Sequence, residues 1–342
     1  MNLTIPAVIQ AAIDRGAAVA ISVSAGKDSQ AMEQALAWLR ERHQWPGPFF
    51  AIHADIGPEF DWAWTVQLCR RNAKALGHPL HVVHRDNGDT LLHTIQKRVA
   101  VTAGTKPPFP SAACRFCTRS AKTDPINKFL RRAGDLVINV MGLRAEESRN
   151  RAKLPQVTIR KEISAERLKN LLPEEALAAW RPGKERLALD WNPILGWTFG
   201  QVLQACGASL TEMESRRALF QLGCYDMAFT GWPASPTYIL GLDRHSCAIC
   251  CMSARREIPI AGRFRPDLVR AIAEMEQASG FSWQKGNPVS ALLSAETRSI
   301  PAQAGQVQPL PQRYKGVGSH NTYTRLPAGI AQNSAVLSRL PI

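Results

Sequence analysis

A short glycine-containing loop near the N-terminus carries side chains that suit phosphate binding. Residues 22–29 of the 342-residue chain read Ser-Val-Ser-Ala-Gly-Lys-Asp-Ser. Serine hydroxyls donate hydrogen bonds, Ala25 and Gly26 let a ligand approach the backbone closely, Lys27 supplies a positive charge, and the Asp28 carboxylate suits Mg²⁺. The loop therefore predicts a polyphosphate site with these candidate residues: Ser22, Ser24, Ala25, Gly26, Lys27, Asp28 and Ser29.

The residue that follows the lysine separates this loop from the Walker loop of P-loop NTPases. A Walker loop continues Gly-Lys with Ser or Thr, whereas Asp28 follows Lys27 here. A strand–turn–helix with an accidental Gly-Lys is the alternative that needs no ligand. Beyond Lys27 the apolar residues recur at helical spacing, so the loop is expected at a helix N-terminus, where backbone N–H groups attract anions.

Cysteines form the second group of side chains that could do chemistry. Of the eight cysteines, four make two Cys-x-x-Cys pairs, Cys114/Cys117 and Cys247/Cys250, and Cys251 follows the second pair directly. Two such pairs predict four thiolates around one metal centre, and we expect a 4Fe-4S cluster, with a structural Zn²⁺ as the alternative. Free thiols are the interpretation that needs no metal. Cys251 is then an alternate ligand or a sulfur carrier, and the three remaining cysteines are expected to be buried as small apolar side chains.

Further candidates stand just after apolar runs. Asp55 ends the run of residues 49–55 and is a candidate for ribose, metal or adenine contact, although a simple strand cap explains it nearly as well. Gly142, Arg144 and Arg151 follow the run of residues 135–141. Guanidinium groups at the end of a buried strand match phosphate oxygens, while a solvated, charged helix start is the alternative.

These residues need elements that bring them to one place. Short apolar runs at residues 17–22, 49–55, 77–86 and 135–141 alternate with segments of helical periodicity. Strands alternating with helices predict an α/β fold built on a doubly wound parallel sheet. In such sheets ligands bind off the carboxyl ends of the strands, where the candidate residues stand.

Composition bounds the remaining possibilities. The net charge of +14 and the pI near 9.8 favour anionic partners, so nucleic acid is an expected partner, with a generically basic surface as the alternative. No run of 18 apolar residues occurs, and the N-terminal stretch is interrupted by Asp14 and Arg15. We therefore expect a cytoplasmic protein without a signal peptide or a membrane span.

The chain divides by composition into four stretches. We expect a nucleotide-binding α/β core at 1–153, a charged helical insertion at 154–190, a cysteine-containing C-terminal part of the same catalytic domain at 191–285, and a tail rich in Pro, Gly and Ser at 286–342.

Four blocks, in order, resemble the phosphoadenosine phosphosulfate (PAPS) reductase family of PP-loop ATP pyrophosphatases. They are residues 24–29, the Cys-x-x-Cys-Thr block at 114–125 that contains Lys122 and ends in Asp-Pro, Gly-x-Arg-x-x-Glu-Ser-x-x-Arg at 142–151, and Gly-Leu-Asp-Arg at 241–244 leading into the second cysteine pair. The resemblance implies an adenine nucleotide α-hydrolase-like fold with a C-terminal elaboration of helices and loops. We call residues 22–29 the PP-loop.

The resemblance also implies roles. In this family the PP-loop grips the pyrophosphate of ATP while the α-phosphate is attacked, which makes Lys27, Asp28, Arg144 and Arg151 the expected catalytic residues. The family includes PAPS and adenosine phosphosulfate reductases, the DNA phosphorothioation sulfurtransferase, and phage and prophage proteins, which this chain resembles most. We therefore expect adenylation of an acceptor, with nucleic acid as acceptor, for sulfur transfer from a sulfur-donor protein.

Two departures from the family pattern bear on activity. Sulfonucleotide reductases carry a catalytic cysteine near the C-terminus, and here no cysteine follows Cys251. Cluster-bearing reductases begin with an adjacent Cys-Cys, whereas this chain begins with Cys114-x-x-Cys117. A sulfonucleotide reductase is thus the second expectation, and a non-catalytic module that binds nucleotide or nucleic acid is the third.

Overall fold

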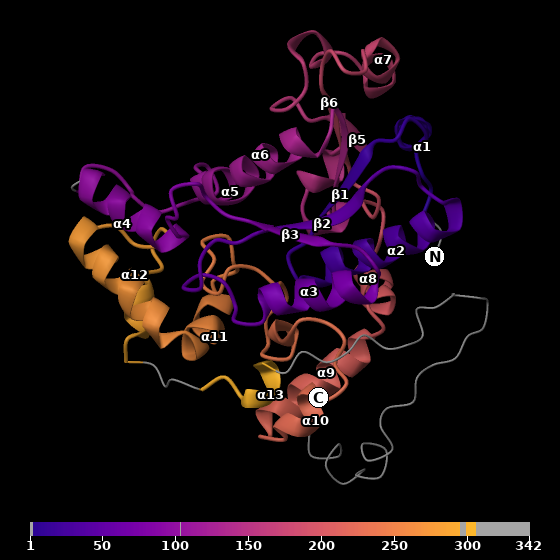
Figure 1. The fold of residues 1–342 in the computed structure, drawn as a ribbon. Coiled ribbons are helices and arrows are strands. Elements are labelled where there is room, and N and C mark those ends of the chain that lie inside the picture. The colour runs from indigo at the N-terminus through magenta and orange to yellow at the C-terminus, as the bar shows by residue number, and fades with distance from the viewer. Residues whose placement is uncertain (1–2, 103, 295–298, 306–342) are drawn as a thin grey trace.

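Six strands form one mostly parallel sheet (Figure 1). The computed structural model describes residues 3–102, 104–294 and 299–305. The strand order is β3-β2-β1-β4-β6-β5. The strand bounds are β1 Ala18–Ser22, β2 Phe49–Ala54, β3 Leu80–Val83, β4 Leu136–Met141, β5 Val157–Ile159 and β6 Leu187–Trp191. Only β5 runs antiparallel, against β6 at one edge. The expected doubly wound α/β sheet is confirmed.

The central strand is β1, which carries the PP-loop at its carboxyl end. Val19 pairs with Phe49 of β2 on one side and with Ile138 of β4 on the other. Because β1 is buried between two parallel neighbours, its sequence is a continuous apolar run rather than an alternating one.

Alternate residues of β1 pack into two cores, one on each face of the sheet. Val19 and Ile21 join the larger core with Leu36 of α2, while Ala18 and Ala20 join a smaller core with Leu130 of α6. In Figure 1, α2, α3 and α8 lie on one face and α5 and α6 on the other. The helix bounds here are α2 Lys27–His43, α3 Thr65–Ala75, α5 Phe116–Thr118, α6 Asp124–Ala133 and α8 Phe199–Ala205.

Local sequence explains where these helices begin and end. Pro125 lies in the first turn of α6, where its missing N–H costs no hydrogen bond. Thr198 caps α8 by accepting a hydrogen bond from the Gln201 N–H. The helix α12, Pro266–Ser279, starts with proline and ends at Gly280, whose φ of 72° terminates it.

Residues 154–190 are not the helical insertion that their charge predicted. The structure forms β5, the short helix α7 at Pro173–Ala179, and β6 within or directly after this stretch. Strand β6 pairs in parallel with β4 along its full length and is nearly all buried. This strand was not predicted because its five residues, Leu-Ala-Leu-Asp-Trp, lie between charged stretches and are too few to show a clear periodicity.

The C-terminal part adds a helical layer below α3 and α8 (Figure 1). The larger core extends from Val8 to Ala304, so the predicted divisions share one core. Residues 286–294 of the predicted tail fold as well, because Val289 is fully buried; residues 306–342 lie outside the described part. The remaining helices are α1 Ala7–Asp14, α4 Leu91–Thr102, α9 Leu210–Gln221, α10 Tyr225–Phe229, α11 Glu257–Phe264 and α13 Ala302–Gly305.

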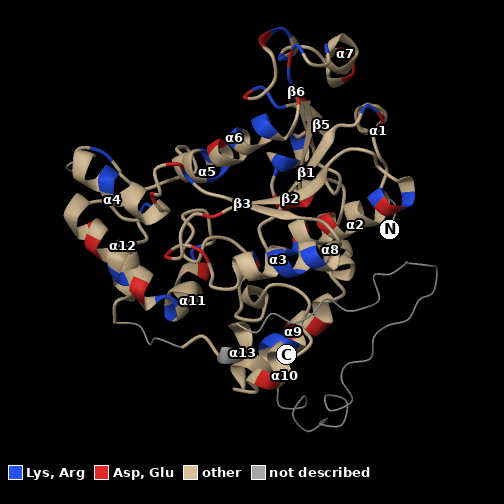
Figure 2. Ribbon diagram, in the orientation of Figure 1, with Lys and Arg blue, Asp and Glu red and all other residues tan. Residues whose placement is uncertain are grey.

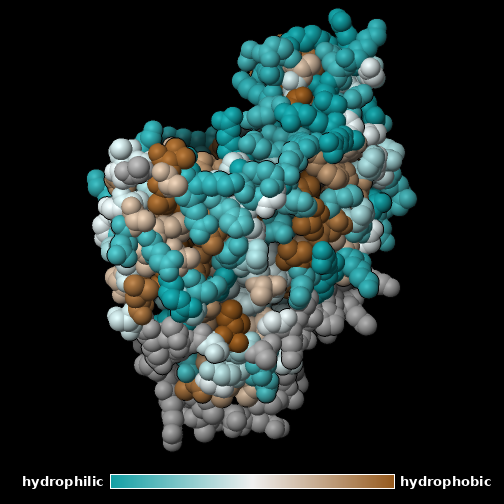
Figure 3. All heavy atoms as spheres, turned by 60° about the vertical axis from the view of Figure 1, so that its left-hand side comes forward, coloured by the Kyte–Doolittle hydropathy of each residue, from teal (hydrophilic) through white to brown (hydrophobic). Residues whose placement is uncertain are grey.

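The described surface is mixed in character. Figure 2 shows Lys and Arg interspersed with Asp and Glu along the helices, with basic bands on α3 and α6. Figure 3 shows small, separate apolar patches on the face that carries α4 and α12. No helix within the described ranges has the length and apolarity needed to cross a membrane.

Candidate functional site

The PP-loop makes its turn through a strained residue. Strand β1 ends at Ser22, Gly26 caps α2, and between them Ala25 has a φ of 57°, in the left-handed region. That conformation costs a residue with a Cβ about 1–2 kcal/mol. Ser29 holds the turn from inside, because its hydroxyl accepts from the Ser24 N–H at 3.2 Å and donates to the Gly26 carbonyl at 2.9 Å.

Two cations converge on the carboxylate of Asp28. Lys27 Nζ lies 3.0 Å from Oδ2, and Arg144 Nε bonds Oδ1. Burial lowers the pKa of Lys27 although Asp28 opposes it, and Lys27 is 2% exposed. Burial by itself would raise the pKa of Asp28, but Lys27 and Arg144 outweigh it and lower that pKa. The buried triad is thus an ionised carboxylate with one cation on each oxygen.

Gly142 explains why β4 delivers Arg144 to the loop. A Cβ at Gly142 would lie 2.9 Å from the Asp28 carbonyl oxygen and 3.0 Å from the Ser29 nitrogen. Only glycine lets the end of β4 come this close to the first turn of α2. The predicted nucleotide-binding residue Gly142 therefore packs the backbone behind the site.

A second carboxylate, that of Glu147, forms an ion pair with the other predicted arginine, Arg151. Glu147 bonds Arg151 through Oε2, and its Oε1 lies 3.4 Å from Arg244. Burial lowers the pKa of Arg151, and the nearby charges of Arg244, Arg115 and Arg144 lower it further, against the pull of Asp28. Four guanidinium groups, Arg115, Arg144, Arg151 and Arg244, therefore come together from three segments and define what we call the mouth of the PP-loop. Arg115 and Arg244 were not among the predicted site residues.

Aromatic side chains complete the surroundings of Lys27. Its Nζ lies 4.9 Å from the ring centroid of Phe199 and 5.3 Å from that of Tyr238. The Tyr238 hydroxyl also accepts a hydrogen bond from the Lys27 backbone N–H at 2.8 Å. Such cation–π contacts keep the ammonium in place in a site with little water. Sequence reasoning missed both rings because they come from segments more than 170 residues away.

Two predicted nucleotide contacts have other partners in the structure. Ser22 donates its hydroxyl to Asn139 Oδ1 at 3.0 Å, within the sheet. Asp55 accepts the Gly57 N–H at 2.8 Å and so closes the turn after β2. Asp55 thus makes the strand-cap contact that was its alternative explanation.

The structure gathers thiols from both cysteine motifs. Cys117 contacts Cys251, and Cys250 contacts both Cys247 and Cys251. Cys247 and Cys251 contribute most to lowering the pKa of Cys250, with Lys122 adding to the effect. Cys114 is exposed. The thiol cluster is therefore Cys117, Cys247, Cys250 and Cys251, in which Cys251 takes the place predicted for Cys114.

Lys122 projects into the thiol cluster from an unusual helical turn. Residues Arg119–Thr123 form a π-helical turn between α5 and α6, and Lys122 Nζ lies 4.0 Å from Cys247 Sγ. The electrostatic effect of the Cys247 sulfur, aided by Asp61, raises the pKa of Lys122 against the effect of burial. π-Helical turns are rare in proteins, and those that occur often lie at functional sites.

The donor chemistry of the cluster suits a metal centre, since thiolates are the ligands that zinc and iron–sulfur clusters take. In the described ranges, however, no three His, Cys, Asp or Glu side chains are grouped as metal ligands would be. The metal centre stays a prediction. Cys69 and Cys206 are buried, as expected, whereas Cys224 is only half-buried. Cys206 donates to the Lys27 carbonyl from beneath the loop.

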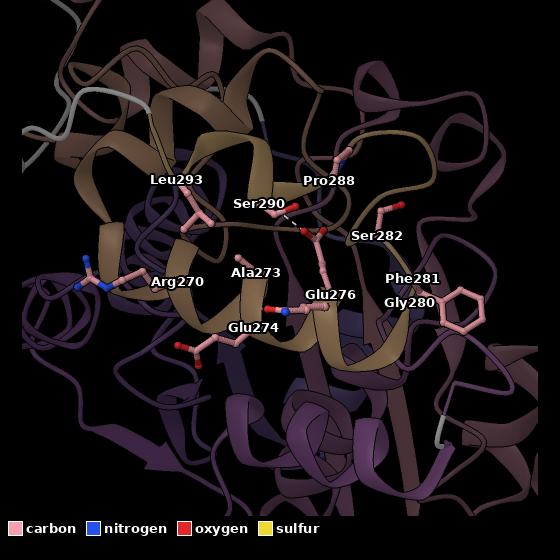
Figure 4. A pocket seen from close by; sticks show the side chains of 11 residues that line it. Arg270, Ala273, Glu274, Glu276, Gly280, Phe281, Ser282, Pro288, Ser290 and Leu293 are labelled. Carbon is pink, nitrogen blue, oxygen red and sulfur yellow. Dashed lines mark hydrogen bonds between the residues drawn. The ribbon is translucent and has the colours of Figure 1, made fainter.

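A cavity of about 620 Å³ lies elsewhere, along α12 (Figure 4). Its buried acid, Glu276, accepts the backbone N–H groups of Trp283, Val289 and Ser290. The Glu276 carboxylate therefore organises the chain after α12. No residue of the PP-loop or of the thiol cluster lines the cavity.

Comparison with known proteins identifies the family of this chain. The phosphoadenosine phosphosulfate reductase domain matches residues 18–226, which is more than half of the chain. A solved structure, the phosphate complex of phosphoadenylyl-sulfate (PAPS) reductase from Candida auris, is 14% identical and covers 58% of this chain and 76% of its own, with a TM-score of 0.36. No curated protein matches. The extent of the domain match shows that the chain belongs to the phosphoadenosine phosphosulfate reductase family.

Proposed function

We propose that the protein is a PP-loop ATP pyrophosphatase that adenylates an acceptor for sulfur transfer. One observation carries the proposal: Lys27 and Arg144 meet on the two oxygens of Asp28 at the start of α2. A buried pair of cations beside a helix N-terminus is suited to phosphate oxygens. Family membership supports a nucleotide-binding enzyme, and the choice of ATP is part of the proposal.

The ion pairs suggest how ATP would be received. Phosphate oxygens would compete with the Asp28 carboxylate for Lys27 and Arg144, because both kinds of anion bind the same two cations. Asp28, released from its partners, would then be available to hold Mg²⁺ with the phosphates. Lys27 would balance the charge that develops on the departing pyrophosphate, and the Arg144 fork would orient the phosphates.

The reaction has two steps. An oxygen of the acceptor attacks the α-phosphorus of ATP, forming an acceptor adenylate while pyrophosphate leaves. The terminal sulfur of a donor-protein persulfide then attacks the activated carbon or phosphorus and AMP leaves, and a second thiol of the donor protein releases the sulfur by forming a disulfide with the donor cysteine. The PP-loop residues bind and orient the nucleotide in the first step.

The arginines at the mouth favour a large anionic acceptor. Arg115 and Arg244 are exposed beside the partly buried Arg151. Guanidinium groups that repel one another are stabilised when phosphodiesters lie between them. With the net charge of +14, this favours nucleic acid as the acceptor.

The thiol cluster would hold the metal centre. Cys117, Cys247, Cys250 and Cys251 would ligate a 4Fe-4S cluster, or alternatively a structural Zn²⁺, with Lys122 balancing the thiolate charge. A cluster would supply a site for sulfur or a local charge, whereas zinc would join the two cysteine loops.

A sulfonucleotide reductase is the second candidate, favoured by the matching domain itself. Residues 252–342 contain no cysteine that could serve as the thiol that attacks the sulfonucleotide. A non-catalytic binding module is the third and predicts no turnover of either nucleotide.

Pyrophosphate release tests these candidates. The purified protein is incubated with Mg·ATP, with and without nucleic acid, and separately with PAPS or adenosine phosphosulfate and a thiol reductant. Release from ATP that rises with nucleic acid supports the proposal, and Lys27→Ala should abolish it while the protein stays folded. Sulfite production without pyrophosphate release would instead identify a reductase. If Lys27→Ala bound ATP and released pyrophosphate like the wild type, the PP-loop assignment would be wrong.

A further inference from the structure

Strand β2 holds Val23, the second residue of the PP-loop, through both its backbone N–H and its carbonyl. The Val23 N–H donates to the Ile52 carbonyl at 2.9 Å, and the Val23 carbonyl lies 3.0 Å from Nδ1 of His53. A carbonyl oxygen only accepts hydrogen bonds, so Nδ1 must carry a proton. His53 is 4% exposed, which shields this hydrogen bond from water.

The other ring nitrogen of His53 faces a carboxylate. Nε2 is buried, lies 3.7 Å from Asp61 Oδ2, and makes no hydrogen bond within the described part of the chain. An unprotonated Nε2 would direct its lone pair at a negative charge, so both nitrogens carry protons. Burial alone would lower the pKa of His53, but the neighbouring Asp61 carboxylate and Cys69 outweigh burial and raise the pKa to about 10.

The neighbours of this pair come from several elements. Cys69 approaches His53 from α3, while Asp61 also faces His245 and Lys122. Burial lowers the pKa of His245 to about 4, so its ring is neutral. The positive charges that balance Asp61 are therefore His53 on the side of the PP-loop and Lys122 on the side of the thiol cluster.

The loop that His53 holds is under strain. Ala25, two residues after Val23, has a φ of 57°. Such a conformation persists only where the surroundings over-determine it. Tyr238 fixes the far end of the turn through the Lys27 N–H, and His53 fixes the near end through the Val23 carbonyl.

We propose that His53, kept charged by Asp61, is a positioning residue that holds the PP-loop in its phosphate-binding shape through the Val23 carbonyl. The inference rests on the proposed role of the loop in binding nucleotide. His53 touches no reacting atom, and it acts by lowering the freedom of a strained turn before the ligand arrives.

Two substitutions separate this role from simple packing. His53→Asn leaves an amide donor near the position of Nδ1, facing Val23, whereas His53→Gln places its amide near Nε2, facing Asp61. The matched controls are His78→Asn and His78→Gln, because His78 is another buried histidine paired with an acid, Glu33, at 3.0 Å. His78 pairs α2 with the start of β3 and makes no contact with the Val23 carbonyl.

The first readout needs no nucleotide. Hydrogen exchange of the loop amides, residues 24–27, is followed in the ligand-free protein. We expect about tenfold faster exchange in His53→Gln, the loss expected for a charge-assisted hydrogen bond, near-wild-type exchange in His53→Asn, and unchanged loop exchange in both His78 variants. Equal exchange in the two His53 variants would overturn the inference.

Two further measurements keep the inference testable if His53→Gln folds poorly. Nitrogen NMR of the histidine rings should show a charged His53 at pH 7 in the wild type and a neutral one in Asp61→Asn; a neutral wild-type ring would refute the inference. The dissociation constant for Mg·ATP should rise about tenfold in His53→Gln. A wild type that binds no Mg·ATP contradicts the proposed function, whereas the exchange experiment still decides the role of His53.

Discussion

Asp28 is the residue on which the proposed chemistry depends, because each of its oxygens already holds a cation that ATP would need. Lys27 bonds Oδ2 and Arg144 bonds Oδ1. In the proposed function, the triad is both the resting arrangement and the site that receives the phosphates. Replacement of either cation leaves a buried carboxylate short of a partner, which costs more than the loss of one contact.

Arg144→Lys should weaken nucleotide binding although the charge is kept. An ammonium cannot reproduce the planar fork that bonds Asp28 through Nε and Glu146 through Nη1. We expect a loss of about 10- to 100-fold in affinity for Mg·ATP, equal to the loss of one charged hydrogen bond. Titration calorimetry measures the affinity, and wild-type binding would show that the Arg144 fork is not needed for nucleotide binding.

Gly142→Ala should disturb the PP-loop from behind. The added Cβ would meet backbone atoms of Asp28 and Ser29, which cannot rotate away. We expect about 1–3 kcal/mol of destabilisation together with weaker ATP binding. Gly196→Ala is the control, because a Cβ there meets nothing within 4 Å. Equal unfolding free energies for the two variants would show that the backbone around Asp28 and Ser29 shifts at little cost to accept the added Cβ.

At the scale of elements, the site depends on loops that the sheet brings to one edge. The PP-loop follows β1, Arg144 follows β4, and Asp61 follows β2, so three neighbouring parallel strands deliver them together. The thiol cluster joins this edge through two connections that lie far apart in sequence, the π-turn before α6 and the loop before α11. This arrangement follows from strand order rather than from any local signal.

The thiol cluster predicts which cysteine ligates metal. After anaerobic purification, Cys251→Ser should lose most of the iron and sulfide, or the zinc, that the wild type carries, while Cys114→Ser should keep it. The reason is that Cys251 contacts Cys117 and Cys250, whereas Cys114 is exposed. Loss in Cys114→Ser alone would restore the set expected from the motif spacing, and absence of metal from the wild type would refute a metal centre.

At the scale of the whole molecule, two properties can be measured: the dependence of nucleic-acid binding on salt and the dependence of stability on pH. The chain has a net charge of +14, and Figure 2 shows Lys and Arg along many of the described helices. The proposed function assigns the exposed arginines at the mouth of the PP-loop to nucleic acid. Binding to nucleic acid through such groups releases counterions, so its dependence on salt counts the phosphates engaged.

The double variant Arg115→Ala, Arg244→Ala should bind nucleic acid more weakly and with a flatter dependence on salt. The slope of log K against log salt should fall by about 1.4–1.8, since each phosphate contact contributes about 0.7 to 0.9. Arg167→Ala is the control, because Arg167 pairs with Glu185 near α7. An unchanged slope in the double variant would show that Arg115 and Arg244 do not contact the phosphates of the nucleic acid.

The pair of His53 and Asp61 predicts how stability varies with pH. The pKa of His53 is raised from 6.5 to about 10, so its contribution is complete below pH 6.5 and is lost as the pH rises to 10. The pKa of Asp61 is lowered, so its contribution is lost in acid. Urea unfolding at a series of pH values should show that the stability difference between wild type and His53→Asn declines by up to about 1.4 kcal/mol per pH unit over this range. A difference that grows with pH would mean a neutral ring.

Local sequence was enough to predict the PP-loop, its helix, and the glycine and arginines after β4. Each of these signals lies within about ten residues, where periodicity, glycine and side-chain chemistry act between chain neighbours. The domain match over residues 18–226 agrees with the family that these blocks indicated. The short strand β6 was not predicted because four apolar residues and an aspartate between charged stretches resemble the start of a helix as much as a strand.

The tertiary structure alone decided which partners meet across the chain. Tyr238 reaches Lys27 over 211 positions, and Cys251 rather than Cys114 joins the thiol cluster. His53 looked like one residue of a buried strand until Val23 and Asp61 appeared on either side of its ring. Such choices follow from strand order and side-chain packing, which depend on contacts between distant segments and leave no periodic trace in the sequence.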